Sequence, residues 1–322
     1  MVADLLEDGG RDAVSDEFFR CAGFFEAEGV THSLRIELAQ GYLVAPLIVR
    51  QIEGSDRVDA ISPYGYPGFR VVGGDPAGPV DPAAPIAPFG PVDPSAIDFS
   101  RTGLVTAFVR HSLGGEPPLA GATPRNVCLV SDPELPRKSR ASDRQQIRKN
   151  LKRGYEVVFV PGPAAGPDDR AGFFRAYTET MERTAAAERY FFSELYFDLI
   201  LDSDRTWLAL ARDADGTVAA ASIAARSDGM LHYYLSGTAD SNLRDSPMKN
   251  VIESMIEFGA ALDLPLNLGG GITPGDPLEE FKRGFANREE QWFTSELICD
   301  PTAYRDLTPP GAGDYFPAYR AP

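Results

Sequence analysis

The chain has 322 residues, of which 43% are apolar and 24% charged, and its formal net charge is −16 at pH 7. This composition is that of a globular protein, and the length exceeds what one hydrophobic core usually supports, so we expect two domains. The acidic balance excludes broad electrostatic binding of nucleic acid. No apolar run reaches the roughly 18 residues of a membrane-spanning helix, and the acidic segment 1–8 lacks the features of a signal peptide, so we expect a soluble, cytoplasmic protein.

The sulfur and imidazole side chains are too scattered to predict a metal site. Three cysteines and three histidines lie far apart in the sequence, with no CxxC, HxxxH or HExxH spacing: Cys21, Cys128, Cys299, His32, His111 and His232. We expect reduced thiols, with neither a disulfide framework nor a bound metal.

The first part of the chain predicts one helix and one hairpin. Residues 11–27 have roughly helical spacing of apolar side chains and end at Gly29. Residues 34–38 and 43–52 are apolar and β-branched, and they lie on either side of Gln40-Gly41, which is typical of a hairpin.

Two stretches rich in proline and glycine follow. Residues 59–68 contain too much Pro and Gly for a regular element, and their tyrosines, Tyr64 and Tyr66, suit either a pocket wall or a surface turn. Residues 71–97 are so dense in proline that we expect an extended loop without a catalytic role.

The middle of the chain places a basic strip on an acidic protein. Strands are predicted at 103–110 and 125–130, and a helix at 142–153 that ends at Gly154. Residues 137–153 hold eight Lys or Arg against a single Asp. The strip is a candidate contact for a few phosphate groups.

The second half of the chain alternates helices and strands more clearly. Its patterns predict helices at 168–187, 193–201 and 246–262 and strands at 155–160, 206–212, 217–226, 230–236, 264–268 and 291–298. Asp215-Gly216 marks a hairpin turn, and Ser246-Pro247 is typical of an N-cap followed by proline at the first helical position. Mixed elements with central antiparallel hairpins predict an α/β or α+β fold.

Residues 266–285 form the stretch that most suggests function. They predict a strand end, a turn of three glycines at 269–271 and a short helix that places Lys282 between Phe281 and Phe285. Glycine has no Cβ, so such a turn lets another backbone or a ligand approach closely. We therefore expect a binding site here.

Six motifs occur in order between roughly residues 55 and 305. They are Ser62-Pro-Tyr-Gly-Tyr-Pro-Gly68, Phe108-Val-Arg110, the basic helix 144–154, Tyr177–Arg183 with Tyr190-Phe191-Phe192, His232-Tyr-Tyr-Leu-Ser-Gly237, and Leu268-Gly-Gly-Gly with Phe281-Lys-Arg-Gly-Phe285. In this order and spacing the set resembles the Fem family of aminoacyl-tRNA-dependent aminoacyltransferases.

The resemblance implies two acetyltransferase-like (GNAT) domains in tandem with a cleft between them. It places an acceptor-side domain at residues 1–142, with the tail 305–322 as a candidate part of it, and an aminoacyl-donor domain at 143–304. No sustained a/d heptads are present, so we expect no coiled-coil arm. The implied enzyme moves an amino acid from aminoacyl-tRNA to an amine of a small peptide or nucleoside, forming a peptide bond. It needs no metal, no cofactor beyond the tRNA co-substrate and no membrane insertion.

By the same resemblance, Lys282 is the lysine that stabilises the oxyanion. An amine attacking an ester carbonyl forms a tetrahedral oxyanion, and a fixed cation nearby lowers the barrier; an ordinary surface lysine is the alternative. Thr180 and Arg183 match a helix that reaches toward anionic groups of the acceptor, although Arg183 could instead pair with Glu179.

Further site residues come from the same motifs. Tyr234 is either a pocket tyrosine or a core residue, and Arg110 either faces the cleft or pairs with a carboxylate. The other candidates for substrate binding are Ser62, Tyr64, Tyr66, Tyr190, Ser236, Gly270 and Phe281. The candidates for tRNA contact are Arg144, Arg148, Lys149, Lys152 and Arg153.

The chain also departs from the family pattern. Cell-wall members have an N-terminal Gln…Trp pattern and a lysine that binds the nucleotide-sugar pyrophosphate, whereas residues 18–36 contain neither tryptophan nor lysine. We therefore expect a smaller peptide-like amine, as in peptide antibiotic biosynthesis, in place of a peptidoglycan precursor.

Aminoacyl transfer to a peptidoglycan precursor, which builds its interpeptide bridge, stays open as an alternative, and so do two other functions. One is a CoA-dependent N-acyltransferase, although residues 242–248, at the position of its pyrophosphate loop, contain no glycine. The other is a binding protein that has lost the chemistry. A conventional hydrolase is disfavoured because the chain has no GxSxG motif.

Overall fold

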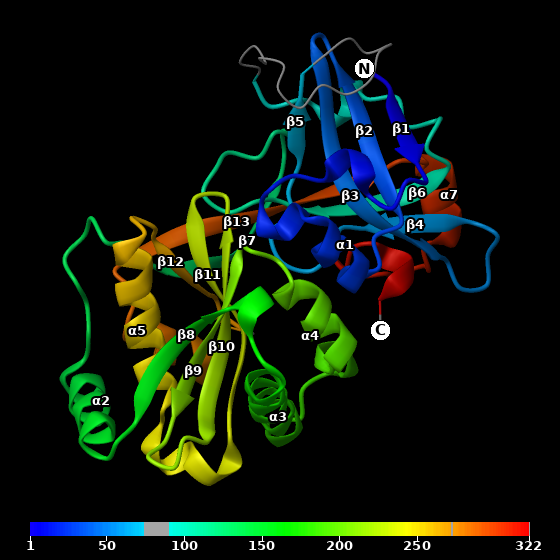
Figure 1. Ribbon diagram of the computed structural model, residues 1–322. Helices are drawn as coiled ribbons and strands as arrows, with labels where there is room; N and C mark the ends of the chain where they lie inside the picture. Colours follow the sequence, from blue (N-terminus) through cyan, green and yellow to red (C-terminus); the bar gives the residue numbers. More distant parts are fainter. Residues whose placement is uncertain (74–89, 272, 322) are drawn as a thin grey trace. The chain divides into compact units, whose positions relative to one another are not determined.

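The computed structural model describes residues 1–73, 90–271 and 273–321 (Figure 1). Within these ranges the chain forms thirteen strands and seven α-helices, so the predicted α/β class is confirmed. The longest of these helices, α3 (Pro167–Arg183), has 17 residues, and none of them extends into a coiled-coil arm. No helix in this part of the chain is both long and apolar enough to cross a bilayer.

The chain divides into two compact units. Unit 1 comprises Met1–Arg125 and Trp292–Pro322, and unit 2 comprises Asn126–Gln291. The chain therefore leaves unit 1, completes unit 2 and returns to unit 1 for its C-terminal segment.

Unit 1 consists mainly of strands. These are β1 (Ala3–Leu6), β2 (His32–Leu38), β3 (Gly41–Gln51), β4 (Val58–Ile61), β5 (Arg70–Val72), β6 (Leu104–Arg110) and the second half of β13 (Arg288–Ile298), with the helices α1 (Ala22–Glu28) and α7 (Pro301–Leu307). The strand order is β1-β2-β3-β4-β6-β13, with β5 beside β3. The pair β4–β6 is parallel and its neighbours are antiparallel. The predicted hairpin is confirmed as β2–β3, which pair from His32↔Leu47 to Leu38↔Gly41.

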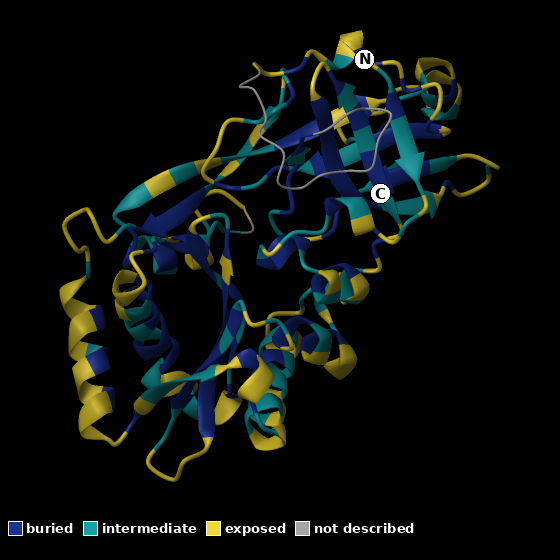
Figure 2. Ribbon diagram, turned by 45° about the horizontal axis from the view of Figure 1, so that its top comes forward, coloured by how far each residue is buried: buried dark blue, intermediate teal, exposed yellow. Residues whose placement is uncertain are grey.

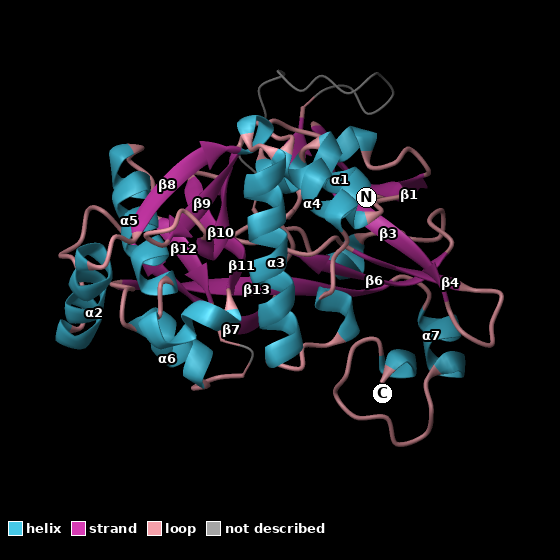
Figure 3. Cartoon of the chain, turned by 60° about the horizontal axis from the view of Figure 1, so that its bottom comes forward, coloured by secondary structure: helices cyan, strands magenta, loops and turns pink. Residues whose placement is uncertain are grey.

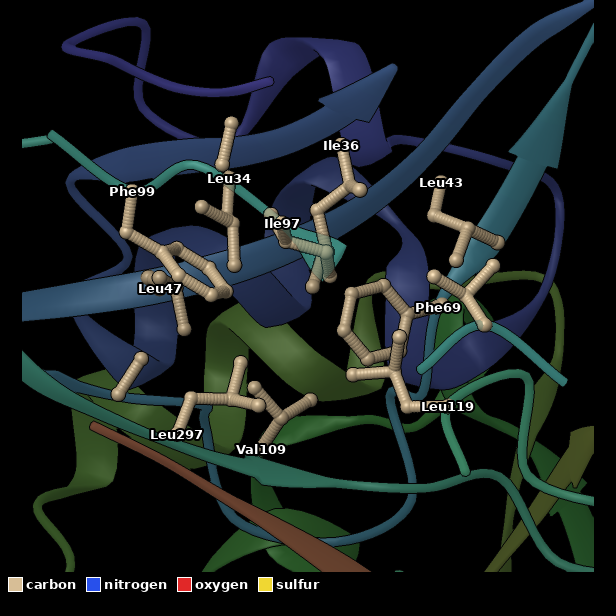
Figure 4. Packing of buried hydrophobic residues seen from close by; sticks show 14 of the residues in the cluster. Leu34, Ile36, Leu43, Leu47, Phe69, Ile97, Phe99, Val109, Leu119 and Leu297 are labelled. Atoms are coloured by element: carbon tan, nitrogen blue, oxygen red, sulfur yellow. The ribbon is translucent and has the colours of Figure 1, made fainter. Parts of the chain in front are cut away.

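The core of unit 1 lies on one face of this sheet. Figure 4 shows side chains of β2, β3 and β6 pointing toward one another, with Leu34, Ile36, Leu43, Leu47 and Val109 fully buried. Leu34 and Ile36 are two residues apart, and alternate residues of a strand face the same side. Each such side chain contributes roughly 1.5–3 kcal/mol by leaving water.

The helix predicted for the first part of the chain is wrong in detail. Residues 11–27 form two 3₁₀ turns followed by α1, not one helix. The reason is that Phe18, Phe19, Phe24 and Phe25 are all buried, whereas on a single helix these positions would point around its whole circumference.

The proline- and glycine-rich regions are more ordered at their edges than predicted. Residues 59–61 belong to β4, because they pair with β3 on one side and β6 on the other. Within 71–97, β5 reaches Val72 and a 3₁₀ turn forms at Pro94–Ala96, while residues 74–89 lie outside the described ranges.

Unit 2 alternates strands and helices. Its strands are β7 (Thr123–Ser131), β8 (Glu156–Pro161), β9 (Thr206–Arg212), β10 (Val218–Ser227), β11 (Met230–Thr238) and β12 (Leu266–Gly269), and its helices are α2 (Ala141–Lys152), α3, α4 (Glu194–Leu201), α5 (Met248–Ala261) and α6 (Pro277–Arg283). The strand order is β7-β12-β11-β10-β9-β8. The pair β11–β12 is parallel and the others are antiparallel.

Helices cover both faces of the unit 2 sheet. Figures 1 and 3 show α3 on one face of strands β8–β11 and α5 on the other. In Figure 2 these strands are mostly buried, whereas α2, which packs on α5, is largely exposed. The predicted cap of α5 is wrong: the N-cap is Pro247 without a side-chain hydrogen bond, and Ser246 adopts a left-handed φ of 47°.

Strand pairing also moves the predicted domain boundary. The boundary at residue 142 lies too far along the chain, because most of β7 already belongs to unit 2. Residues 292–304 belong to unit 1, because the second half of β13 pairs with β6. The tail 305–322 is also part of unit 1.

Candidate active site

Local hydrogen bonds build the glycine turn and the helix that follows it. β12 ends at Gly269, whose φ of 72° costs glycine no steric strain. Asp276 is the N-cap of α6, and its Oδ1 accepts a hydrogen bond from the Glu279 N–H at 2.7 Å. Proline follows the cap at the first helical position, where its missing N–H is not needed. The sequence Asp-Pro-x-Glu thus starts the helix that contains Lys282.

Lys282 is a buried cation. The residue is 8% exposed, and its Nζ donates a hydrogen bond of 2.7 Å to the Gly270 carbonyl. Burial lowers the pKa of Lys282 to about 8, against the opposing effects of Cys128 and Asp276 nearby. At pH 7 the Lys282 side chain is therefore still protonated in most molecules. Lys282 is not the surface lysine that the sequence left as an alternative.

The strands next to Lys282 diverge. β11 and β12 pair in parallel up to His232↔Asn267, and β11 then continues to Thr238. Leu235 has a φ of 46° and shifts the register of β11 against β10, which is a β-bulge. Tyr233 follows the last pair directly, and the centroid of its ring lies 6.0 Å from the Lys282 Nζ.

Tyr233 was not among the predicted site residues, but it lies beside Lys282. Its hydroxyl accepts a hydrogen bond of 2.5 Å from the Ser236 Oγ, and burial raises its pKa to about 12. The phenol therefore stays protonated at neutral pH. Of the predicted residues, the structure brings Gly270 together with Lys282, and it connects Ser236 to Lys282 through Tyr233. Phe281 precedes Lys282 in the chain, and its ring packs on that of Phe285 at 5.7 Å.

The predicted pocket tyrosine, Tyr234, points the other way. Successive residues of a strand face opposite sides of the sheet, and the Tyr234 hydroxyl lies 2.9 Å from that of Tyr196 on α4. Tyr234 is 5% exposed, so the core-packing alternative describes it. Tyr190 is on the same side, and its carbonyl accepts a hydrogen bond of 2.7 Å from the Tyr177 hydroxyl.

Thr180 and Arg183 lie together at the end of α3. The Thr180 Oγ1 accepts a hydrogen bond of 2.9 Å from the Thr238 N–H, and Arg183 donates to the Thr180 Oγ1 at 3.0 Å. The carboxylate that pairs with Arg183 is that of Asp240, whereas Glu179 offers it a carbonyl. These contacts attach α3 to the end of β11.

The unit 1 candidates fall into two groups. Ser62 is 1% exposed, its Oγ accepts from the Arg110 N–H at 2.9 Å, and its carbonyl accepts from the Arg110 guanidinium at 2.6 Å. These two residues are therefore brought together. Tyr66 packs its ring edge-on against Trp292 at 5.9 Å, whereas Tyr64 is 41% exposed.

Helix α2 presents a basic face to solvent. Its buried residues are Asp143, Ile147 and Asn150, spaced along one side, and the exposed residues include Arg144, Arg148, Lys149 and Lys152. Arg153, just after the helix, forms an ion pair with Asp245. The strip thus keeps several cations on its outer face.

Hydrogen bonds also fix the segment before α5. Residues 240–245 form a 3₁₀ helix in which the Asp245 carboxylate pairs with Arg153 and accepts a hydrogen bond of 3.0 Å from the Tyr155 hydroxyl. The Asp245 carbonyl accepts from the Asn150 amide at 2.8 Å. Two carboxylates, those of Asp240 and Asp245, therefore occupy the stretch leading into α5.

The described residues contain no cluster of His, Cys, Asp or Glu that could hold a metal ion. The buried imidazole of His232 instead contacts Asn267, and the sequence analysis had assigned neither residue a role. The sequence features that could have drawn attention to them are the His232-Tyr-Tyr run and the position of Asn267, two residues before three glycines.

Comparisons with known proteins agree with this architecture. Residues 137–283 match the family model described as an acetyltransferase (GNAT) domain. No curated protein matches the chain. The structure is similar to that of FemX, with 10% identity, a TM-score of 0.55 and coverage of 85% of this chain and 89% of that one.

Two further solved structures are similar to the chain. One is the C-terminal domain of a putative lysylphosphatidylglycerol synthetase from Agrobacterium fabrum, with 13% identity, a TM-score of 0.55 and 92% of each chain covered. The other is a conserved protein of unknown function from Bacteroides thetaiotaomicron VPI-5482, with 10% identity, a TM-score of 0.53 and coverage of 88% and 90%. The chain thus has a Fem-like tandem GNAT fold, and its residues 137–283 match the acetyltransferase (GNAT) domain model.

Proposed function

We propose that the protein is an aminoacyltransferase that moves an amino acid from aminoacyl-tRNA to an amine of a small peptide-like acceptor. The observation that supports this most is the position of Lys282, a buried cation held by the neutral Gly270 carbonyl where β11 and β12 diverge. A carbonyl carries no full negative charge, so the ammonium that it holds keeps a positive charge that can act on a substrate.

The proposed role of Lys282 follows from its environment. Attack of the acceptor amine on the ester carbonyl puts negative charge on the carbonyl oxygen, and a fixed cation in a site of low dielectric stabilises that charge strongly. The amine forms the new C–N bond, the bond from the carbonyl carbon to the tRNA ribose oxygen breaks, and the proton that the amine loses ends on that oxygen, which leaves as a hydroxyl. The protonated Tyr233 hydroxyl and the Ser236 hydroxyl are further donors beside this site.

The segment before α5 argues against acetyl-CoA as the donor. A CoA-dependent enzyme of this domain type holds pyrophosphate with the N–H groups of a glycine-rich loop at a helix start. Here that segment lacks glycine, and its carboxylates, Asp240 and Asp245, form ion pairs with Arg183 and Arg153. These two arginines are thus engaged within the protein, which disfavours their use as ligands of a pyrophosphate.

The basic face of α2 is the proposed contact for tRNA. Lys149 and Lys152 are exposed there with Arg144 and Arg148, while the chain as a whole carries a net charge of −16. A few phosphate contacts on an acidic protein predict weak binding that is sensitive to salt. We propose that tRNA docks through this helix alone.

The acceptor we propose is a small peptide-like amine of the kind used in peptide antibiotic biosynthesis. The basis is the absence of lysine and tryptophan from residues 18–36. In unit 1, Ser62 and Arg110 contact each other, and we propose that they contribute to acceptor binding with Tyr64 and Tyr66.

The test is a transfer assay with radiolabelled amino acids on total charged tRNA. The acceptors are a panel of small peptide and nucleoside amines, a peptidoglycan precursor and phosphatidylglycerol, and acetyl-CoA is assayed in parallel as the donor. The proposal expects label on a peptide or nucleoside amine, abolished by ribonuclease. Acetyl transfer without transfer from tRNA would contradict it. Label on the precursor or the lipid would keep the donor and replace the acceptor.

A further inference from the structure

Asn267 and His232 form a buried polar pair at the last rung between β11 and β12. Each residue is 2% exposed, and they are register partners in the parallel pairing. Buried amide and imidazole groups are costly unless they are hydrogen-bonded, so their partners show what they hold in place.

A chain of hydrogen bonds runs from this pair to the glycine turn. The His232 Nε2 donates to the Ser227 carbonyl at 3.2 Å, which leaves Nδ1 as an acceptor for the Asn267 amide at 3.1 Å. The Asn267 Oδ1 then accepts from the Gly269 N–H at 2.8 Å. The Asn267 side chain is therefore fixed at both ends, by a histidine on one side and by the turn on the other.

The turn that Asn267 holds forms one wall around Lys282. The Gly269 φ of 72° directs the chain so that the next carbonyl, that of Gly270, accepts from the Lys282 Nζ at 2.7 Å. A Cβ built on Gly269 would lie 3.3 Å from that Nζ, so the turn is in close contact with the ammonium. Movement of the turn would admit water to Lys282.

The other groups around Lys282 come from separate elements. They are the Tyr233 ring on β11, Cys128 on β7 and Asp276 at the start of α6. Burial lowers the pKa of His232 to about 4, so the imidazole stays neutral and keeps Nδ1 as an acceptor at neutral pH.

We propose that Asn267, supported by His232, is a positioning residue that fixes the glycine turn and thereby the ammonium of Lys282. The catalytic importance of this arrangement rests on the proposed function, but the positioning itself does not. Asn267 contacts Lys282 only through the turn, so its effect on Lys282 is indirect.

The experiment observes Lys282 directly. The chain contains five lysines, so protein labelled with ¹³C at lysine Cε gives five signals, and Lys282→Arg identifies the one from Lys282. Titration of that signal measures its pKa, expected at about 8 in the native protein. Loss of the Asn267 hydrogen bonds should admit water and raise this midpoint by about one pH unit toward the ordinary value.

Four variants separate positioning from general stability. Asn267→Ala removes both hydrogen bonds, and His232→Leu removes the support of Asn267 while keeping the site filled, so both should show the raised midpoint. His232→Asn offers an oxygen close to the position of Nδ1 and should restore the native value. The matched control is Asn250→Ala, a buried amide on α5 that is 2% exposed and bonds to Asn150, and it should leave the midpoint unchanged.

The proposal fails if the Lys282 midpoint is unchanged or lower in either Asn267→Ala or His232→Leu protein that circular dichroism shows to be folded. His232→Leu keeps the test decisive should Asn267→Ala not fold. No substrate is used, so failure of this proposal is distinct from failure of the proposed aminoacyl transfer.

Discussion

Asp59 in unit 1 and Lys282 in unit 2 are both buried charged residues, but Asp59 has partners of opposite charge, whereas Lys282 has a neutral one. The Asp59 side chain is fully buried and pairs with Arg50 at 3.1 Å and with Arg320 at 2.5 and 3.0 Å. It also accepts a hydrogen bond of 3.2 Å from the Tyr319 hydroxyl. Lys282 instead donates to a neutral carbonyl.

The difference supports a structural role for the Asp59 charge and agrees with the catalytic role proposed for the Lys282 charge. The partners of Asp59 neutralise it and join the C-terminal segment to β3 and β4, so its charge is fully used within unit 1. The carbonyl of Gly270 orients the Lys282 ammonium without neutralising it, so the protein bears a desolvation cost that folding alone does not explain.

The largest expected effect is on unit 1. Asp59→Ala leaves Arg50 and Arg320 without their buried carboxylate, and breaking such a cluster typically costs about 3–5 kcal/mol. The free energy of unfolding measured by urea titration should fall by that amount. Asp56→Ala, at a side chain that is 97% exposed, is the control and should leave the urea midpoint unchanged. A small loss in Asp59→Ala would mean that the cluster contributes little to unit 1.

Lys282→Met should have the opposite effect, lowering the transfer rate without lowering the free energy of unfolding. Removal of the oxyanion donor should lower the single-turnover transfer rate about 10²–10³-fold, while the free energy of unfolding stays level or rises because a buried charge is removed. The control is Lys249→Met, because Lys249 pairs with the buried Asp143 at 2.9 Å. It should reduce stability and leave the transfer rate at its native value. An unaltered rate in Lys282→Met would remove the proposed mechanism.

Each unit also has a buried histidine that should make it sensitive to acid. Burial lowers the pKa of both His111 and His232 to about 4, whereas an unfolded histidine titrates near 6.5. Between these values the unfolded chain binds more protons, so stability falls as the pH falls. Each histidine should account for about 2 kcal/mol of the loss between pH 8 and pH 5.

Urea titrations at pH 8 and pH 5 test this prediction. His111→Gln and His232→Asn should each reduce the difference between the two unfolding free energies by about 2 kcal/mol. If a variant keeps the full difference, the corresponding histidine is not responsible for it.

The smallest effect should be on tRNA binding. Lys149→Ala combined with Lys152→Ala should weaken binding about 3–10-fold and reduce the slope of log K against log salt by between about 1 and 2, with the rate at saturating tRNA unchanged. Arg226→Ala, at an exposed cation on β10, is the control and should alter neither. Fluorescence titration of charged tRNA at several salt concentrations gives both values, and an unchanged slope would exclude α2 as the contact.

Local sequence patterns were sufficient to predict most helices and strands of unit 2. The strands β9, β10 and β11 lie close to where apolar alternation and the Asp215-Gly216 turn predict them, and α6 is the short helix predicted after the glycine turn. Each of these signals acts within a few residues, so the sequence is enough to recognise it.

Predictions failed where contacts between residues far apart in the sequence determine the local structure. The four phenylalanines near the N-terminus are buried from several directions, so one helix could not satisfy them. Residues 59–61 become a strand because β3 and β6 lie on either side. The site shows the same limit: Lys282 was predicted through a resemblance, whereas its neighbour Tyr233 was not among the predicted residues and Tyr234 lies on the opposite face of β11.

The sequence by itself determined the α/β class, the basic surface of α2 and the short helix that contains Lys282, because helix periodicity and charge are local properties. Only the tertiary structure decided that Lys282 is buried against Gly270 and Tyr233, and that Asn267 meets His232, a residue 35 positions away. The pairing of β11 with β12 creates the contact between Asn267 and His232, and strand pairing depends on the packing of the whole sheet.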